Sequence, residues 1–168
     1  MISIVIIIIS LLLDGLLTNY LPFLVNNLSL FTPLFTLISI SIIYPFYRKK
    51  EKEYYSMVFI IGIIYDLCYT NLLFLNAIMF LIIAIVSKYI YKNFEITFFR
   101  LIVYTIIIIT IYEFITAGII GILGLVPITI ERIIYKITHS IVLNVIYVEI
   151  IYLILKLIPK KYKKISIN

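Results

Sequence analysis

Charged residues are scarce in this chain, and they make up 13% of its 168 residues. Soluble globular domains carry about 25% charged and about 45–50% apolar residues. Here 64% of the residues are apolar. A small water-soluble fold could not bury that much apolar surface, because its own surface is large relative to its volume. The composition therefore predicts an integral membrane protein.

Cysteine and histidine are scarce too, with Cys68 and His139 the single residue of each type. One cysteine excludes an intramolecular disulfide and a cysteine-based metal site. One histidine cannot build a metal centre alone, so we expect His139 to form hydrogen bonds near the membrane interface. The sequence contains neither a Gly-rich phosphate loop nor paired carboxylates beside a Ser or Cys nucleophile. We therefore expect no enzyme, and neither a cofactor nor a metal.

Long apolar runs are abundant instead. A helix crosses the hydrocarbon core with about 20 apolar residues, at a rise of about 1.5 Å each. In lipid the backbone must satisfy its own hydrogen bonds, which favours helices. The first run lacks the basic start and cleavage site of a signal peptide, so we expect it to be retained. The prediction is an all-α, single-domain bundle of six transmembrane helices over about 2–21, 28–47, 54–71, 72–91, 101–125 and 138–158.

The segment 126–137 has a helical pattern of its own. Isoleucines at 130, 133, 134 and 137 fall on one face of a helix. One interpretation is a short amphipathic helix that lies in the plane of the membrane interface. The other is that the segment prolongs the sixth helix by a turn or two. The pattern fits both.

Lys and Arg gather on one side of the predicted bundle. The two sides carry 12 and 2 of the 14 basic residues. Basic loops stay in the cytoplasm, so we expect both chain ends on that side. The net charge of +6 then reflects topology and attraction to anionic membrane lipid. It does not indicate nucleic-acid binding, because the charges are scattered over short loops.

Four acidic residues lie within predicted spans: Asp14, Asp66, Glu113 and Glu149. An acid near the centre of a membrane helix costs about 2.5–3.5 kcal/mol, so it usually faces the interior and has a partner. No Lys or Arg lies in the well-buried part of these spans. The acids are therefore protonated, hydrogen-bonded to polar side chains, or paired with a cation from another chain.

The predicted depths bring the acids towards three other polar side chains in the central and outer levels of the membrane. These are Asn76, His139 and Asn144. We expect these seven residues to share one cavity. Three roles are open for this cluster: a structural hydrogen-bond network, a contact with a partner or ligand, and proton or ion transport. Gly118, Gly121 and Gly124 form a stripe on the fifth helix, and we expect it to allow close internal helix packing.

Four stretches resemble the rod shape-determining protein family MreD. They are "LLLDGLLTNY" (11–20), "PLFTLISISIIYPFY" (33–47), "GIIYDLCYTNLLFLN" (62–76) and "HSIVLNVIYVEIIY" (139–152). The third is the most specific, because Gly62 precedes an Asp-Leu pair by four residues and a short polar turn follows. We expect Gly62 to be a helix-packing residue. The length and predicted topology of the whole chain agree with this family.

The resemblance implies a multi-pass protein of the bacterial inner (cytoplasmic) membrane in the cell-elongation machinery. MreD-like proteins bind MreC and act with MreB filaments, RodA and a class B penicillin-binding protein, without a known catalytic activity. Their fold is similar to that of the substrate-binding S-component of energy-coupling-factor vitamin transporters. Such an S-component is the alternative function. Its first helix typically carries an A-x-x-x-A-like stretch, whereas the first helix here has no Ala.

Overall fold

The computed structural model describes residues 2–20, 32–70, 72–93, 97–124 and 129–157. These residues form α-helices and no β-strand, so the all-α prediction is confirmed for them. The helices are α1 (Ile2–Tyr20), α3 (Phe35–Ile43), α4 (Glu51–Tyr69), α5 (Leu75–Asn93), α6 (Phe98–Ile122) and α7 (Ile130–Leu157), and the 3-10 helix η1 (Tyr44–Tyr47) continues α3.

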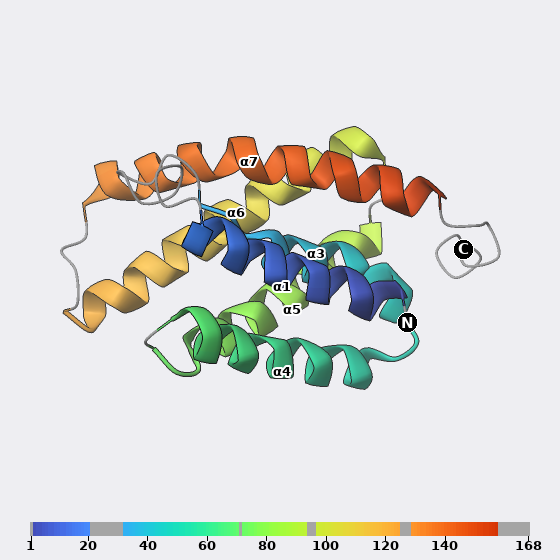
Figure 1. The fold of residues 1–168 in the computed structure, drawn as a ribbon, viewed down its shortest axis with the longest axis horizontal. Coiled ribbons are helices and arrows are strands. Elements are labelled where there is room, and N and C mark those ends of the chain that lie inside the picture. The colour runs from blue at the N-terminus through green and yellow to red at the C-terminus, as the bar shows by residue number, and fades with distance from the viewer. Residues whose placement is uncertain (1, 21–31, 71, 94–96, 125–128, 158–168) are drawn as a thin grey trace.

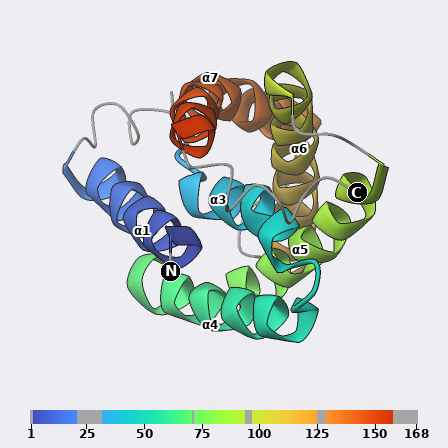
Figure 2. The same cartoon turned by 90° about the vertical axis from the view of Figure 1, so that its right-hand side faces the viewer.

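Successive helices run in alternate directions along the long axis of the molecule (Figure 1). The start of α1 and the end of α7 therefore lie at the same end of the bundle. Seen along that axis, α3 stands in the centre, and α1, α4, α5, α6 and α7 surround it (Figure 2). This up-and-down order suits an even number of membrane crossings, and the six crossings themselves stay a prediction.

The central helix α3 is shorter than the sequence predicts. All nine of its residues are buried, and at about 1.5 Å per residue they extend over roughly 14 Å. The helix begins at Phe35 and not near residue 28, although 28–31 lie outside the described residues. Pro33 accounts for a late start, because the residue before a proline is disfavoured in the α conformation. The first backbone N–H groups of α3 therefore lie inside the protein.

Two further boundaries differ from the sequence prediction. Helix α5 begins at Leu75 rather than near residue 72, because a turn precedes it in which Phe74 has a φ of 68°. Helix α7 begins at Ile130 and continues without a break to Leu157. The segment from residue 130 onward thus prolongs the last helix, and a separate interfacial helix is not formed there. No Gly or Pro interrupts 130–157. Residues 126–128 lie outside the described part of the chain.

The outward faces of the surrounding helices are apolar. Ile8 of α1 is 51% exposed, Ile60 of α4 is 56% exposed and Ile146 of α7 is 52% exposed. Soluble monomers rarely expose large contiguous apolar surface. Among the described residues, two helices, Phe98–Ile122 and Ile130–Lys156, are long and apolar enough to span a membrane, and three more have shorter apolar stretches. By length and composition these helices fit the membrane placement that the sequence predicts.

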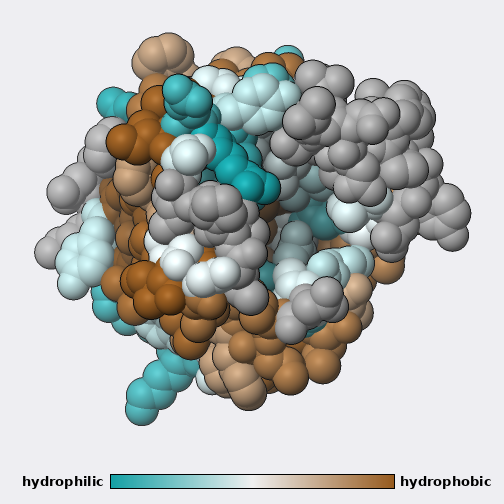
Figure 3. Space-filling model, turned by 90° about the vertical axis from the view of Figure 1, so that its left-hand side faces the viewer, coloured by the Kyte–Doolittle hydropathy of each residue, from teal (hydrophilic) through white to brown (hydrophobic). Residues whose placement is uncertain are grey.

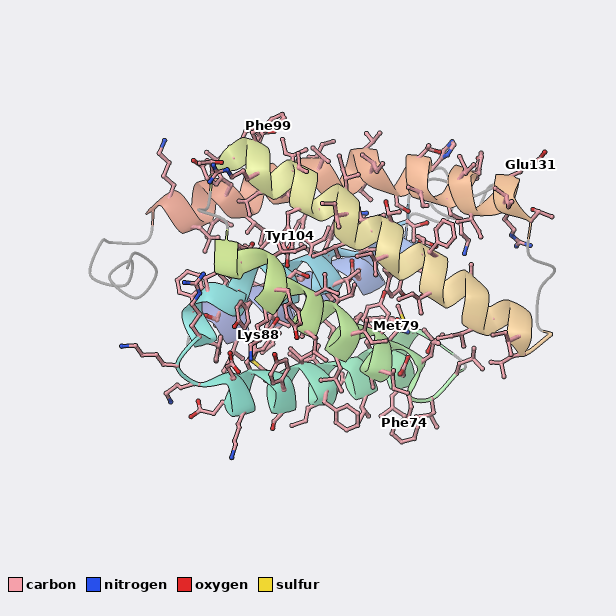
Figure 4. All side chains as sticks on the ribbon, turned by 180° about the vertical axis from the view of Figure 1, so that it is seen from behind. Phe74, Met79, Lys88, Phe99, Tyr104 and Glu131 are labelled. Atoms are coloured by element: carbon pink, nitrogen blue, oxygen red, sulfur yellow. The ribbon has the colours of Figure 1, made fainter. Side chains whose placement is uncertain are left out.

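Tyrosines fill the interior near the end of the bundle where α1 starts. Tyr54 is fully buried, and its hydroxyl donates to the carbonyl of Ile40 over 3.0 Å. Tyr104 points into the bundle, whereas Phe99 on the same helix points away from it (Figure 4). Lys88 reaches α4, where its Nζ lies 2.7 Å from the Glu51 carboxylate. The Tyr104 hydroxyl donates to the Ser87 Oγ of α5. These contacts join α3, α4, α5 and α6 at this end.

Candidate functional site: buried carboxylates at two helix N-termini

Asp14 lies in α1 and is 2% exposed. Its Oδ1 accepts a hydrogen bond from the Phe35 N–H, and its Oδ2 accepts one from the Thr36 N–H, each over 2.9 Å. The first four N–H groups of a helix have no partner within that helix. The helix start also carries a partial positive charge, equivalent to roughly half an elementary charge. Asp14 therefore caps α3 from a neighbouring helix, and no Lys or Arg is needed.

Asn144 of α7 completes the cap on the opposite side. Its Oδ1 accepts from the Leu34 N–H over 2.9 Å, and its Nδ2 donates to the carbonyls of Thr32 (2.9 Å) and Ser140 (2.7 Å). The Asn144 side chain is fully buried. Together Asp14 and Asn144 satisfy three consecutive N–H groups at the start of α3, and they fix α1 and α7 against it.

Asp66 of α4 performs the same task for α5. Its carboxylate accepts from the Asn76 N–H (3.1 Å), the Ala77 N–H (3.2 Å) and the Asn76 side-chain amide (2.8 Å). Thr70 donates a further hydrogen bond over 3.0 Å. The Oδ1 of Asn76 in turn accepts from the Tyr112 hydroxyl of α6 over 2.7 Å. Asp66, which is 1% exposed, thus connects α4, α5 and α6.

The two helical hairpins, α1–α3 and α4–α5, use the same arrangement. In each, an Asp of the first helix caps the start of the second. A small residue lies one turn before each Asp and faces the second helix. Ser10 is that residue in α1, and its Oγ lies 2.6 Å from the Oγ of Ser39. Gly62 is its counterpart in α4, where an added Cβ would overlap the backbone of Ala77 and lie 2.9 Å from its nitrogen.

The two caps belong to one polar region. Both Asp14 and Asp66 interact electrostatically with the phenols of Tyr65 and Tyr112. The end of α1, the starts of α3 and α5 and the end of α4 lie at the same end of the bundle (Figure 1). A view onto this end shows apolar side chains over much of the rim and polar residues nearer the middle (Figure 3).

Glu113 of α6 is buried as well, at 4% exposure. The charge of Lys136 acts on it from a distance. Lys136 lies in the second turn of α7, because that helix begins at Ile130 and packs against α6. No hydrogen bond or ion pair joins the two side chains in the described part of the chain.

Two of the seven predicted cluster residues are not buried with the rest. Glu149 is exposed on α7. His139 is partly exposed and stacks on Tyr135, with 3.8 Å between the ring centroids. Its Nδ1 lies 2.8 Å from the Tyr135 carbonyl oxygen. The structure thus brings together Asp14, Asp66, Asn76 and Asn144, and it buries Glu113 on α6.

Two of the three glycines in the predicted stripe, Gly118 and Gly124, have no close neighbour in the described part of the chain. An added Cβ at Gly118 would have no neighbour within 4 Å, and Gly124 follows the helix end at a φ of 68°. Gly121 is half-buried. The end of α6 is largely uncovered, as the 88% exposure of Ile122 shows. A glycine that the sequence analysis did not single out does pack closely, because a Cβ at Gly15 would overlap the Tyr69 ring.

A second polar contact that the sequence analysis missed connects α1, α3 and α7. The hydroxyl of Tyr147 lies 2.5 Å from the Oγ of Ser10 and 2.7 Å from the Oγ of Ser39. Serines and tyrosines are too frequent in this chain for such a contact to be visible in the sequence. Taken together, the side chains of Asp14, Asp66, Asn76 and Asn144 are engaged with one another and with helix starts. In the described ranges, no three His, Cys, Asp or Glu side chains are placed to hold a metal ion.

A family model described as rod shape-determining protein MreD matches residues 1–161. No curated protein and no solved structure matches the chain. The matched range contains both capped hairpins, as well as α6 and α7. It covers almost all of the 168 residues. The chain therefore belongs to the MreD family of rod shape-determining proteins.

Proposed function

We propose that this protein is a non-catalytic membrane scaffold of the bacterial cell-elongation machinery. It crosses the inner membrane six times, with both ends in the cytoplasm. It binds MreC and helps to couple MreB filaments to peptidoglycan synthesis by RodA and a class B penicillin-binding protein. The observation that carries this proposal is the MreD family match over residues 1–161, since that family acts in rod shape determination.

The hydrogen bonds of the acids support a scaffold over a proton or ion carrier. The carboxylate oxygens of Asp14 and Asp66 accept hydrogen bonds from backbone N–H groups at helix starts. Carriers commonly need broken helices that rearrange around a central site. Here each capping carboxylate instead fixes one helix against the next. A rigid bundle of this kind can hold a partner laterally in the membrane.

Affinity purification of the tagged protein from native membranes tests the MreC contact. We expect MreC to co-purify with the wild-type chain. In our proposal MreC contacts the outer end of the bundle, where the turn between α4 and α5 lies. Leu73→Glu in that turn should therefore weaken the recovery of MreC, since Leu73 is 61% exposed. Tyr89→Glu is the matched control, because Tyr89 is 70% exposed near the opposite end of the bundle. Absence of MreC from the wild-type preparation would contradict the proposal.

Mass spectrometry of the purified protein tests the alternative. A vitamin bound in stoichiometric amount would favour an S-component of a vitamin transporter over a scaffold. Labelling of cysteines introduced near each chain end tests the topology. Both ends should react from the cytoplasmic side, and an end that reacts from outside would overturn the six-crossing arrangement.

A further inference from the structure

Glu149 is an unpaired carboxylate on the outer face of α7. It is exposed, and no described residue forms a hydrogen bond or ion pair with it. Asp14 and Asp66, by contrast, accept hydrogen bonds inside the protein, and Glu113 is buried at 4% exposure. Glu149 is therefore the exposed acid of the predicted spans, and the described chain does not supply its partner.

The position of Glu149 along α7 places it at membrane depth. The apolar stretch Ile130–Lys156 is long enough to span a membrane. Lys156, seven residues after Glu149, lies about 10 Å further along the helix axis. Lys side chains near helix ends extend towards the interface. With a hydrocarbon core about 30 Å thick, Glu149 lies well inside it. A carboxylate facing lipid at that depth is costly, and such residues usually have a partner.

The surroundings of Glu149 have the spacing of a helix-docking face. Val142, Ile146, Glu149 and Leu153 follow one another at intervals of four, three and four residues. This is the alternation that packs two helices side by side with a shallow crossing angle. The three apolar members are 52–54% exposed. Helix α7 lies along one edge of the bundle, so no other described helix covers this face (Figure 1).

We propose that this stripe of α7 docks a single transmembrane helix of another protein, and that this helix presents a hydrogen-bond donor to the Glu149 carboxylate. The apolar flanks pack against the apolar partner helix, and the donor removes the cost of the carboxylate in lipid. A second copy of this chain is disfavoured as the occupant, because parallel α7 helices would oppose Glu149 to Glu149. The inference rests on the membrane placement proposed above and assigns the face through which a partner is held.

Photocrosslinking in native membranes tests this face. p-Benzoyl-phenylalanine replaces Ile146 or Leu153, one at a time. Ile60 is the matched control, because it is 56% exposed on α4, which lies across the bundle from α7 (Figure 2). We expect Ile146 and Leu153 to crosslink to an identified protein whose single span contains a donor residue, and Ile60 not to do so. Glu149→Leu should lower the crosslink yield about 3- to 20-fold, the effect of losing one interhelical hydrogen bond in a membrane.

Substitution of the partner's donor should lower the yield by the same factor, and combining both substitutions should add little. The fold is preserved in these variants, because Glu149 has no internal partner to lose, and the thermal midpoint of purified Glu149→Leu checks this. Crosslinks to a second copy, no crosslink from α7, or a yield that Glu149→Leu leaves unchanged would overturn the inference. MreC co-purification without these crosslinks would leave the scaffold function intact, whereas crosslinks to a different single-span protein would support the face and contradict MreC as its occupant.

Discussion

Removal of the Asp66 carboxylate tests whether the buried acids hold the bundle together. In Asp66→Leu the backbone N–H groups of Asn76 and Ala77 lose their acceptor, since both donate to this carboxylate over 3.1–3.2 Å. Each buried donor that is left unsatisfied costs about 1–3 kcal/mol. The expected loss of stability is therefore about 2–6 kcal/mol from the two donors. Asp66→Asn keeps one oxygen but turns an N–H₂ group towards a donor, so we expect an intermediate loss.

The thermal midpoint of the detergent-purified protein measures this loss. For a chain of this size, 1 kcal/mol shifts the midpoint by about 2–4 °C. Asp66→Leu should therefore lower the midpoint by about 4–24 °C, as followed by size-exclusion chromatography of heated samples. Glu149→Gln is the matched control, because an exposed substitution without partners stays within about 0.5 kcal/mol of the wild type.

Hydrogen exchange adds a local readout to the thermal measurement. The N–H groups of Asn76 and Ala77 should exchange faster in Asp66→Leu, because they depend on the carboxylate for protection. The first turns of α6, around the buried Leu101, should be unaffected at temperatures where the variant is folded. A midpoint within about 2 °C of the wild type, with unchanged exchange at the start of α5, would refute the capping role.

Three other positions give smaller or opposite effects. Gly62→Val should destabilise the protein by about 1–3 kcal/mol, because the new side chain overlaps the backbone of Ala77; the detergent midpoint checks this. Gly118→Ala should stabilise it by about 0.4–1 kcal/mol, because no atom lies within 4 Å of the new Cβ and alanine favours the helix; an unchanged or lower midpoint would contradict that. A hydrogen bond from Lys88 lowers the pKa of Glu51, which precedes the third predicted span, from its usual 4.5. The stabilisation by ionised Glu51 is therefore present at neutral pH and lost as the pH falls below 4.5, and a denaturation series from pH 7 to pH 3 should show that loss in the wild type and not in Glu51→Gln.

The sequence predicts the helices, because an apolar run in lipid has few alternatives to a helix. It does not predict where α3 begins. The residue at its N-cap position is Leu34, which offers no side-chain acceptor. Its caps come from Asp14, 21 residues away from Phe35 in the chain, and from Asn144, 110 residues away from Leu34. Helix-start signals in a sequence are local. A cap from another helix becomes visible only when the helices are packed.

The sequence also does not reveal most partners of the acids. It predicts polar side chains or cations in that role, and Asn76 is indeed a partner of Asp66. Backbone N–H groups cannot be predicted as partners, because their availability depends on where a helix starts. Nor does the sequence separate Glu149 from the buried acids. Membership of an apolar run gives the depth of a residue, whereas the face depends on the neighbours, and Val148, next to Glu149, is fully buried.

The acids of the predicted spans divide into two kinds, and the division follows from what the interior can supply. A carboxylate in lipid needs donors, and a helix that starts inside the protein has N–H groups in need of acceptors. Asp14 and Asp66 accept hydrogen bonds at the helix starts of α3 and α5. The buried carboxylates and the buried N–H groups thus satisfy each other within one chain. No helix of the described ranges starts beside Glu149, and the face around it is apolar and exposed. Inside the bundle, α3 and α5 supply the donors that Asp14 and Asp66 need. In our proposal another protein supplies the donor that Glu149 needs. Glu149, and not Asp14 or Asp66, therefore marks the surface for a partner.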